Sequence, residues 1–254
     1  MTNSPFSDEV MKERLFDRRN VEALEFILER EGRRLRDYDV PTENERWIYS
    51  INEIREKIFP EVKDSVEKFL EVKSQPSVEI EPLGILSTIL TLIFTHGYGA
   101  YHSGKRIIKI NNFNKKEIMK AVLTHEYVHH VQTSEGVPYS FLGFSILREG
   151  HAEGIENKIT NEPFLLLKKR NQYLEVAYHL ICMATRSKQK IQLSSTLGKN
   201  IMEGRILSFL ERKSLFDLSY YELGTAFFSL SELKHGQSVY ARALRRDEGI
   251  LELH

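Results

Sequence analysis

The stretch His125-Glu126-Tyr127-Val128-His129 lies near the middle of the chain, in a segment whose pattern is typical of a helix. Asn114-Lys115-Lys116-Glu117 forms a capping box that predicts the helix start, and Gly136 and Pro138 predict an end at about Ser134. Side chains four residues apart on a helix lie on the same face, so both imidazoles can reach one metal ion. We therefore expect a metal site on this helix.

Glu126 has a different place in the same motif. It is turned about 100° from His125 around a helix, so its carboxylate borders the metal instead of binding it. There it can act as a general base toward a water molecule that the metal holds. Ile118 and Val122 precede the two histidines on one helical stripe, which predicts that both imidazoles are buried. Buried imidazoles need partners, and a metal ion supplies one. The alternative is a pair of packed or surface histidines.

A catalytic zinc ion usually takes three protein ligands and leaves a fourth position for water, so one more ligand is needed. The next predicted helix, roughly residues 140 to 159, carries Leu147-Arg148-Glu149-Gly150-His151-Ala152-Glu153. A turn at Gly136 and Pro138 lets this helix fold back against the first. Two of its glutamates are four residues apart and therefore share a helix face.

With this spacing the sequence resembles the gluzincins, metallopeptidases in which a glutamate downstream of His-Glu-x-x-His is the third metal ligand. Nineteen residues separate His129 from Glu149, as in the thermolysin-like branch and one more than in the gluzincin aminopeptidases. The resemblance covers about 100 residues, with gaps, between Tyr101 and Gly236. It does not reach residues 1 to 75.

The segment around Glu149 carries the resemblance further. Glu149-Gly150-x-Ala152-Glu153 is similar to the aminopeptidase pattern Asn-Glu-Gly-Phe-Ala, with Arg148 in place of the asparagine and His151 in place of the aromatic residue. We assign Glu149 to the metal and Glu153 to an outer position, as an acceptor for the remaining N–H of a ligand imidazole. The alternatives are Glu153 or His151 as the ligand. Two imidazoles and a carboxylate favour zinc, although other metals accept this set.

A later segment, Tyr221-Glu222-Leu223-Gly224, is similar to the Tyr-x-x-Gly helix start of gluzincin aminopeptidases. In that family the tyrosine polarises the scissile carbonyl, so the resemblance implies this role for Tyr221. A packing role for the aromatic ring is the alternative, and Tyr220 and His235 are weaker candidates. Aminopeptidases also carry Gly-x-Met-Glu-Asn to hold the substrate amine, whereas residues 99 to 104 here contain no carboxylate. We therefore do not expect aminopeptidase activity.

The overall pattern predicts a mainly helical fold with a small β-sheet (α+β). Residues 6 to 73 indicate two long charged helices; Ser7 is the expected cap of the first, and Thr42-Glu43-Asn44-Glu45 is the capping box of the second. Pro60 is expected to kink or divide the second helix. We predict an N-terminal helical region over residues 1–75 and a zincin-like domain over residues 76–254.

Two segments precede the metal-binding helix. Leu83 to Thr95 predicts a buried helix. Tyr101 to Asn111 predicts a strand with Gly104 in a hairpin. In zincins a strand in this place borders the cleft and pairs with an extended substrate, and an ordinary internal strand is the alternative.

Composition limits the classes of partner. Thirty-six basic residues balance 36 acidic ones, so the bulk charge gives no reason to expect a nucleic-acid or membrane partner. A hydrophobic fraction of 41% and a charged fraction of 28% are typical of a soluble, helix-rich protein. Cys182 is the only cysteine and is expected in the core. Its isolation and an N-terminus without a signal-peptide pattern favour a cytoplasmic location.

The expected function is zinc-dependent hydrolysis of a peptide or protein substrate, with Glu126 as general base and acid. The alternative is a zinc-binding regulatory or interaction protein with little or no hydrolytic activity, in which the N-terminal helices bind a partner, form an oligomer or shield the cleft. A third possibility is a helical scaffold in which the motif is accidental. The sequence leaves the oligomeric state open.

Overall fold

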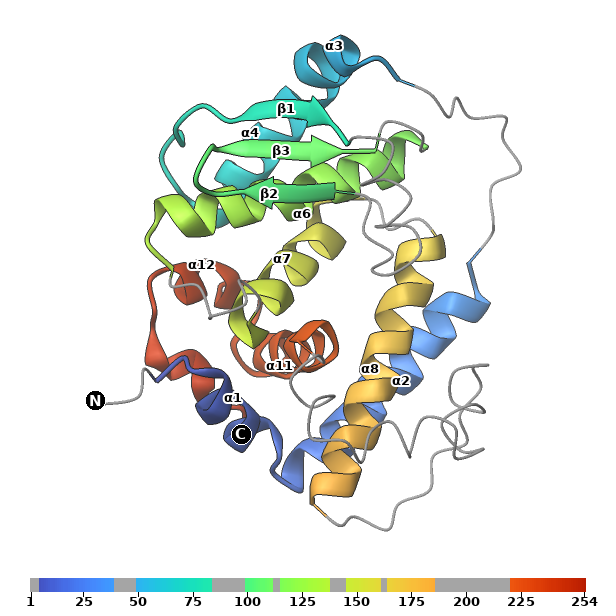
Figure 1. Ribbon diagram of the computed structural model, residues 1–254. Helices are drawn as coiled ribbons and strands as arrows, with labels where there is room; N and C mark the ends of the chain where they lie inside the picture. Colours follow the sequence, from blue (N-terminus) through green and yellow to red (C-terminus); the bar gives the residue numbers. More distant parts are fainter. Residues whose placement is uncertain are drawn as a thin grey trace. The chain divides into compact units, whose positions relative to one another are not determined.

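A computed structural model describes residues 5–38, 49–83, 99–111, 115–137, 145–160, 164–185 and 220–254. Within these ranges the fold is mainly helical with one three-stranded sheet, which confirms the predicted class (Figure 1). The helical elements are α1 (Asp8–Leu15), α2 (Arg19–Arg36), α3 (Ile51–Glu53), the π-helical η1 (Ile54–Ile58), α4 (Phe59–Leu70), α6 (Lys116–Ser134), α7 (Ile146–Ile159), α8 (Phe164–Ala184), α11 (Tyr220–His235), α12 (Val239–Leu244) and the 3₁₀-helical η2 (Glu248–Leu251). The strands are β1 (Glu79–Pro82), β2 (Gly99–His102) and β3 (Ile107–Ile110). Among the described helices, none has the length and apolar character needed to span a membrane.

The chain contains two compact units. Unit 1 comprises Met1–Tyr38, Tyr139–Glu153 and Leu167–His254, and unit 2 comprises Asp39–Pro138 and Gly154–Leu166. The division falls inside α7 and α8, so each of these continuous helices contributes residues to both units. The predicted division into residues 1–75 and 76–254 stays a prediction.

In unit 2 the sheet lies against α6, as Figure 1 shows. The strand order is β1-β3-β2, with β1 parallel and β2 antiparallel to β3. Ile108 and Ile110 of β3 are buried, as expected of the face that packs on the helix, whereas Ile107 and Lys109, on the other face, are partly exposed. The predicted hairpin at Gly104 is confirmed, because a turn over residues 103 to 106 joins β2 to β3.

The helices at the start of unit 2 form from local signals. Ser50 and Glu53 form a capping box at the start of α3, each accepting a backbone N–H of the other residue. A π-helical segment follows, and α4 then begins with Pro60 in its first turn, where a missing N–H costs little. The helical backbone continues through Pro60, and the change from π- to α-helix falls at Phe59, so the predicted kink or division at Pro60 stays a prediction. The predicted capping box at residues 42 to 45 lies outside the described residues.

Unit 1 is organised around α11, which contacts α1, α2, α12 and η2. A continuous run from Leu223 to Ser231 is buried on this helix. Ser7 caps α1 by accepting the N–H of Val10, which confirms the predicted cap. Asp8 accepts the N–H of Ile146 at 2.8 Å and so satisfies a donor at the start of α7.

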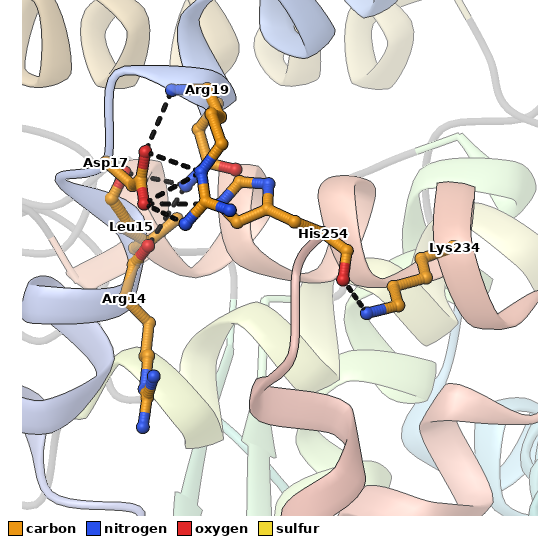
Figure 2. A network of polar contacts seen from close by, with 7 residues as sticks. Arg14, Leu15, Asp17, Arg19, Lys234 and His254 are labelled. Carbon is orange, nitrogen blue, oxygen red and sulfur yellow. Dashed lines mark hydrogen bonds and ion pairs between the residues drawn. The ribbon is translucent and has the colours of Figure 1, made fainter.

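The first predicted long helix is in fact two helices, because the helical structure is interrupted between Leu15 and Arg19. Figure 2 shows the polar contacts at this break: Asp17 accepts the backbone N–H of Arg19 at 2.9 Å and pairs with its guanidinium. Asn20 donates to the carbonyls of Arg14 and Leu15, which are terminal acceptors of α1. The junction contains no glycine or proline, so the sequence pattern did not predict that the helix is interrupted there.

His254 contacts the junction between α1 and α2. The imidazole of His254 lies 3.6 Å from the carboxylate of Asp17, and Lys234 donates to the His254 carbonyl (Figure 2). Hydrogen bonds from Arg19 lower the pKa of Asp17 from 3.8 to about 2. Cys182 is buried, as expected of a core residue. The helix expected from Leu83 to Thr95 falls almost entirely outside the described residues.

Candidate metal site

Helix α6 carries the motif and is buried over most of its length. It ends at Ser134, as predicted, and Gly136 follows with a φ of 73°, a left-handed conformation that suits glycine at the end of a helix. Its buried residues include His125, Glu126 and His129, which are 7%, 9% and 8% exposed. Polar groups this deeply buried need partners, so the contacts of each one are informative.

His125 contacts a carboxylate on the neighbouring helix α7. Its Nδ1 lies 3.0 Å from Oε2 of Glu156, which is also buried. An ionised carboxylate only accepts hydrogen bonds, so Nδ1 carries the hydrogen and donates it. The lone pair of the ring is then on Nε2, the nitrogen that can bind a metal. Both residues belong to unit 2, so this contact fixes how the second half of α7 lies on α6.

His129 is oriented in the same way by its own helix. Its Nδ1 lies 2.9 Å from Oε1 of Gln132, one turn further along α6. The amide oxygen accepts the hydrogen of Nδ1, which leaves the lone pair of His129 on Nε2 as well. The two rings are 4.8 Å apart between centroids and nearly perpendicular. Both imidazoles can therefore bind a metal ion through Nε2 while Nδ1 donates to a protein acceptor.

Glu149 is the third residue of a group that can hold a metal ion. The ligand atoms of His125, His129 and Glu149 lie within 4.8 Å of one another, and all three side chains are buried. Glu149 and Glu156 are seven residues apart on α7 and therefore lie about two turns apart on the same side of this helix. Two imidazole nitrogens and one carboxylate oxygen are the donor set of many catalytic zinc sites.

A second group, His125, Glu153 and Glu156, satisfies the same distance criterion. Its carboxylates already have cationic or N–H partners. Glu156 accepts from His125, and Glu153 forms a 2.9 Å ion pair with Lys169 of α8. An ammonium ion beside Glu153 disfavours a metal ion at the same carboxylate by charge repulsion. The ion pair with Lys169 therefore argues against Glu153 as a metal ligand.

The side chain of Glu126, on α6, lies against the start of strand β2. A Cβ atom added to Gly99 would come within 2.7 Å of Val122 Cγ1, 3.1 Å of Glu126 Cγ and 3.3 Å of Glu126 Oε1. Only glycine allows the strand backbone to approach α6 so closely. In the described sheet β2 has β3 on one side only, so an edge strand runs beside the candidate general base.

His130 connects α6 to two other segments of unit 2. It is fully buried; its Nε2 donates to the Pro76 carbonyl at 2.9 Å, and its Nδ1 accepts from the Tyr101 hydroxyl at 3.0 Å. Burial is the main reason that the pKa of His130 is lowered. Because Tyr101 belongs to β2, this hydrogen bond also connects the edge strand to the helix that carries the motif.

The other glutamates of the region form a charged cluster in unit 1. Lys169 pairs with Glu153, and the ring of Tyr173 lies 5.4 Å below the Lys169 ammonium. Glu222 is close enough to interact with both charges. Its pKa is raised, first by burial and then by the Glu153 carboxylate, while Lys169 acts in the opposite direction. The predicted contact of Glu153 with a ligand imidazole stays a prediction.

The remaining sequence candidates have other described contacts within unit 1. Tyr221 lies in the first turn of α11, with its ring 6.0 Å from that of Tyr173. His151 is buried and its Nε2 donates to the carbonyl of Tyr240 at 2.9 Å, so it faces α12. His235 interacts with the carbonyl of Glu252 at 2.9 Å. The role proposed for Tyr221 stays a prediction.

The two motif glycines, in contrast, meet directly. A Cβ added to Gly150 would lie 2.4 Å from the backbone of Gly224, and one added to Gly224 would lie 2.6 Å from Gly150. Helices α7 and α11 therefore cross at backbone contact, which no larger residue allows. Gly150 follows Glu149 and Gly224 is three residues after Tyr221, so each motif contains a packing residue beside its proposed functional one.

Glu156 and Gly99 are the residues that sequence reasoning missed. Glu156 shares a helical face with Glu149 and Glu153, at spacings of four and three, and this periodicity was the available signal. No pattern in the sequence indicated the role of Gly99, because that role depends on where β2 crosses α6.

Comparison of the chain with protein-family models, with curated proteins and with solved structures finds no significant match.

Proposed function

We propose that this chain is a zinc-dependent peptidase of the gluzincin type, with His125, His129 and Glu149 as the metal ligands. The observation that carries the proposal is the buried grouping of these three side chains, whose ligand atoms lie within 4.8 Å of one another. A purely structural zinc site is usually closed by four protein ligands. Three protein ligands beside a further glutamate that does not bind the metal are more typical of a catalytic site.

The residues around the group support the choice of zinc. Two nitrogen donors and one oxygen donor suit zinc, whereas magnesium and calcium prefer oxygen alone. Glu156 and Gln132 each accept the Nδ1 hydrogen of one imidazole. Such partners fix the tautomer and increase the basicity of a metal-binding imidazole.

In the proposed reaction, bound zinc would polarise the scissile carbonyl and lower the pKa of a water molecule. Glu126 removes a proton from the attacking water and later delivers it to the leaving amine. Tyr221 is proposed as a donor to the oxygen that becomes negatively charged, on the strength of the motif resemblance alone.

The substrate class follows from the strand beside Glu126. An edge strand presents backbone N–H and C=O groups that can pair with an extended peptide, with little sequence selectivity. Gly99 brings the start of β2 against Glu126, so a peptide paired with this strand would pass close to the general base. We therefore propose that the substrate is an unfolded or extended polypeptide segment.

The test is the turnover of the Glu126→Gln variant on a broad peptide library, measured by mass spectrometry with zinc present. Loss of a general base costs about 10²- to 10⁴-fold in rate, while zinc content should stay that of the wild type. Glu135→Gln is the matched control, because Glu135 follows the same helix and its carboxylate binds the exposed side chain of Gln75.

Two outcomes would count against the proposal. Cleavage by Glu126→Gln at the wild-type rate would contradict the role of this residue. Stoichiometric zinc without cleavage of any library peptide by the wild-type chain would favour the alternative of a zinc-binding regulatory or interaction protein.

A further inference from the structure

A cavity of about 210 Å³ lies in unit 2, lined by α4, α6 and the residues at the end of α7. It does not include the metal group: its α6 residues are Glu117, Lys120 and Thr124, which follow one another at spacings of three and four on their own face. Drug-sized ligands occupy pockets of roughly 300–1,000 Å³, so this cavity suits a smaller molecule.

The hydroxyl groups that line the cavity have already used their hydrogens. Ser65 donates to the Glu61 carbonyl at 2.7 Å, Thr124 to the Lys120 carbonyl at 2.8 Å and Thr160 to the Glu156 carbonyl at 2.6 Å. A hydroxyl has one hydrogen and two acceptor lone pairs. Toward a ligand, therefore, these three hydroxyls can only accept.

The charged side chains lead to the same conclusion. Lys120, the cation of the lining, is ion-paired with Glu61 at 2.6 Å. Glu117 supplies a second carboxylate, and its Oε2 is buried without a hydrogen-bond partner among the described residues. A buried carboxylate oxygen without a donor is costly, and a charge-assisted hydrogen bond from a ligand would remove that cost. The lining thus offers acceptors and an excess negative charge.

We propose that this cavity binds a small organic ammonium ion through N–H donors to Glu117 and the hydroxyl groups of Ser65, Thr124 and Thr160. A primary ammonium has three donors and a single positive charge, which match the acceptors and the charge of the lining. A bare metal ion would leave most of the volume unfilled. The inference stands independently of the proposed peptidase activity.

The test is isothermal titration of the full chain with ethylammonium chloride. Tetramethylammonium chloride is the key comparison, because it has the same charge and no N–H donor, and sodium chloride tests for a simple cation. We expect saturable binding of ethylammonium in the millimolar range or tighter, at one site per chain, and none of the other two. Equal binding of tetramethylammonium or of sodium would overturn the proposal, as would no binding of ethylammonium up to 50 mM, roughly the weakest binding that a single charge-assisted contact supports.

Two variants place the binding in the cavity. Glu117→Gln removes the charge and should weaken binding about tenfold or more. Ser65→Leu fills the cavity from an exposed position of α4 and should abolish binding without disturbing the helix. Glu56→Gln, at an exposed glutamate outside the cavity, is the matched control and should bind as the wild type does. Unchanged affinity in both Glu117→Gln and Ser65→Leu, with folding confirmed by circular dichroism, would overturn the assignment.

Discussion

Helices α2 and α6 have similar lengths but follow opposite burial rules. On α2 the buried positions are Val21, Leu24 and Ile27 with the polar Asn20 and Glu31, and most of the other residues are charged. On α6 almost every position from Ala121 to Gln132 is buried, including three histidines and Glu126. The burial of α2 follows mainly from its hydrophobic stripe, whereas the burial of α6 extends beyond the stripe that contains Ile118 and the two motif histidines.

The two helices differ in what their buried polar side chains contact. Burying a polar side chain costs free energy unless it gains a partner, so a fold tolerates many such residues only where they are paired or used. On α2 the buried Glu31 is neutralised by two arginines, and Asn20 caps the end of α1. On α6 the Nδ1 contacts of His125 with Glu156 and of His129 with Gln132 orient both imidazoles so that Nε2 can bind a metal ion.

The largest effect on stability is expected in α2. Leu24→Ala removes a fully buried side chain and should lower the free energy of unfolding by about 2–5 kcal/mol. Urea denaturation measures the loss, and zinc content of the folded protein should not change. A variant that lost zinc while remaining folded would show that α2 supports the site, and it would contradict the distinction drawn between α2 and α6.

Glu156→Gln should affect α6 in the opposite manner. It keeps the volume of the side chain but removes the negative charge beside His125, so zinc affinity should fall about 10- to 100-fold with a smaller change in stability. Competition with a fluorescent zinc chelator measures the affinity. Glu22→Gln on the exposed face of α2 is the control. Equal affinities in the two variants would mean that Glu156 does not tune the site.

The pH dependence of stability should report on His130. Burial lowers the pKa of His130 below its ordinary value of 6.5, so the unfolded chain takes up the proton first as the pH falls. This contribution is fully present above pH 6.5 and is lost progressively below it. Urea titrations between pH 8 and 5 should therefore show a steeper loss for the wild type than for His130→Gln. Parallel curves would contradict the lowered pKa.

The smallest effect is expected from Arg34→Ala on α2. Arg34 pairs with Glu31 at 2.8 Å, but its side chain is 48% exposed and Arg30 pairs with the same carboxylate. Exposed ion pairs contribute about 0.2–1 kcal/mol, and the remaining arginine limits the loss further. Thermal unfolding should shift by no more than a few degrees. A loss of several kcal/mol would mean that the pair is part of the core.

Local patterns predicted much of this structure. The motif helix, its end before Gly136, the hairpin at Gly104 and the Ser7 cap all follow from residues close in sequence. Strand β1 escaped prediction because it is four residues long, contains Pro82 and exists through parallel pairing with β3. The interruption before Arg19 was not predicted, because side-chain hydrogen bonds stabilise it and it contains no glycine or proline.

The site divides in the same way. His125, Glu126 and His129 could be predicted because their spacing alone places them on a helix. Glu156 could not be assigned to His125, since the contact requires knowing how α7 packs on α6. Gly99 acts through the absence of a side chain, which no residue pattern reveals.

The most direct test is the zinc content per chain of the purified protein and of its His129→Ala variant, measured by inductively coupled plasma mass spectrometry after equilibration with zinc and removal of excess metal. The wild type should retain about one zinc per chain and the variant little or none, because loss of one of three ligands opens the site. A wild-type chain without zinc, or a folded variant that retains as much zinc as the wild type, would contradict the assignment of these residues as metal ligands.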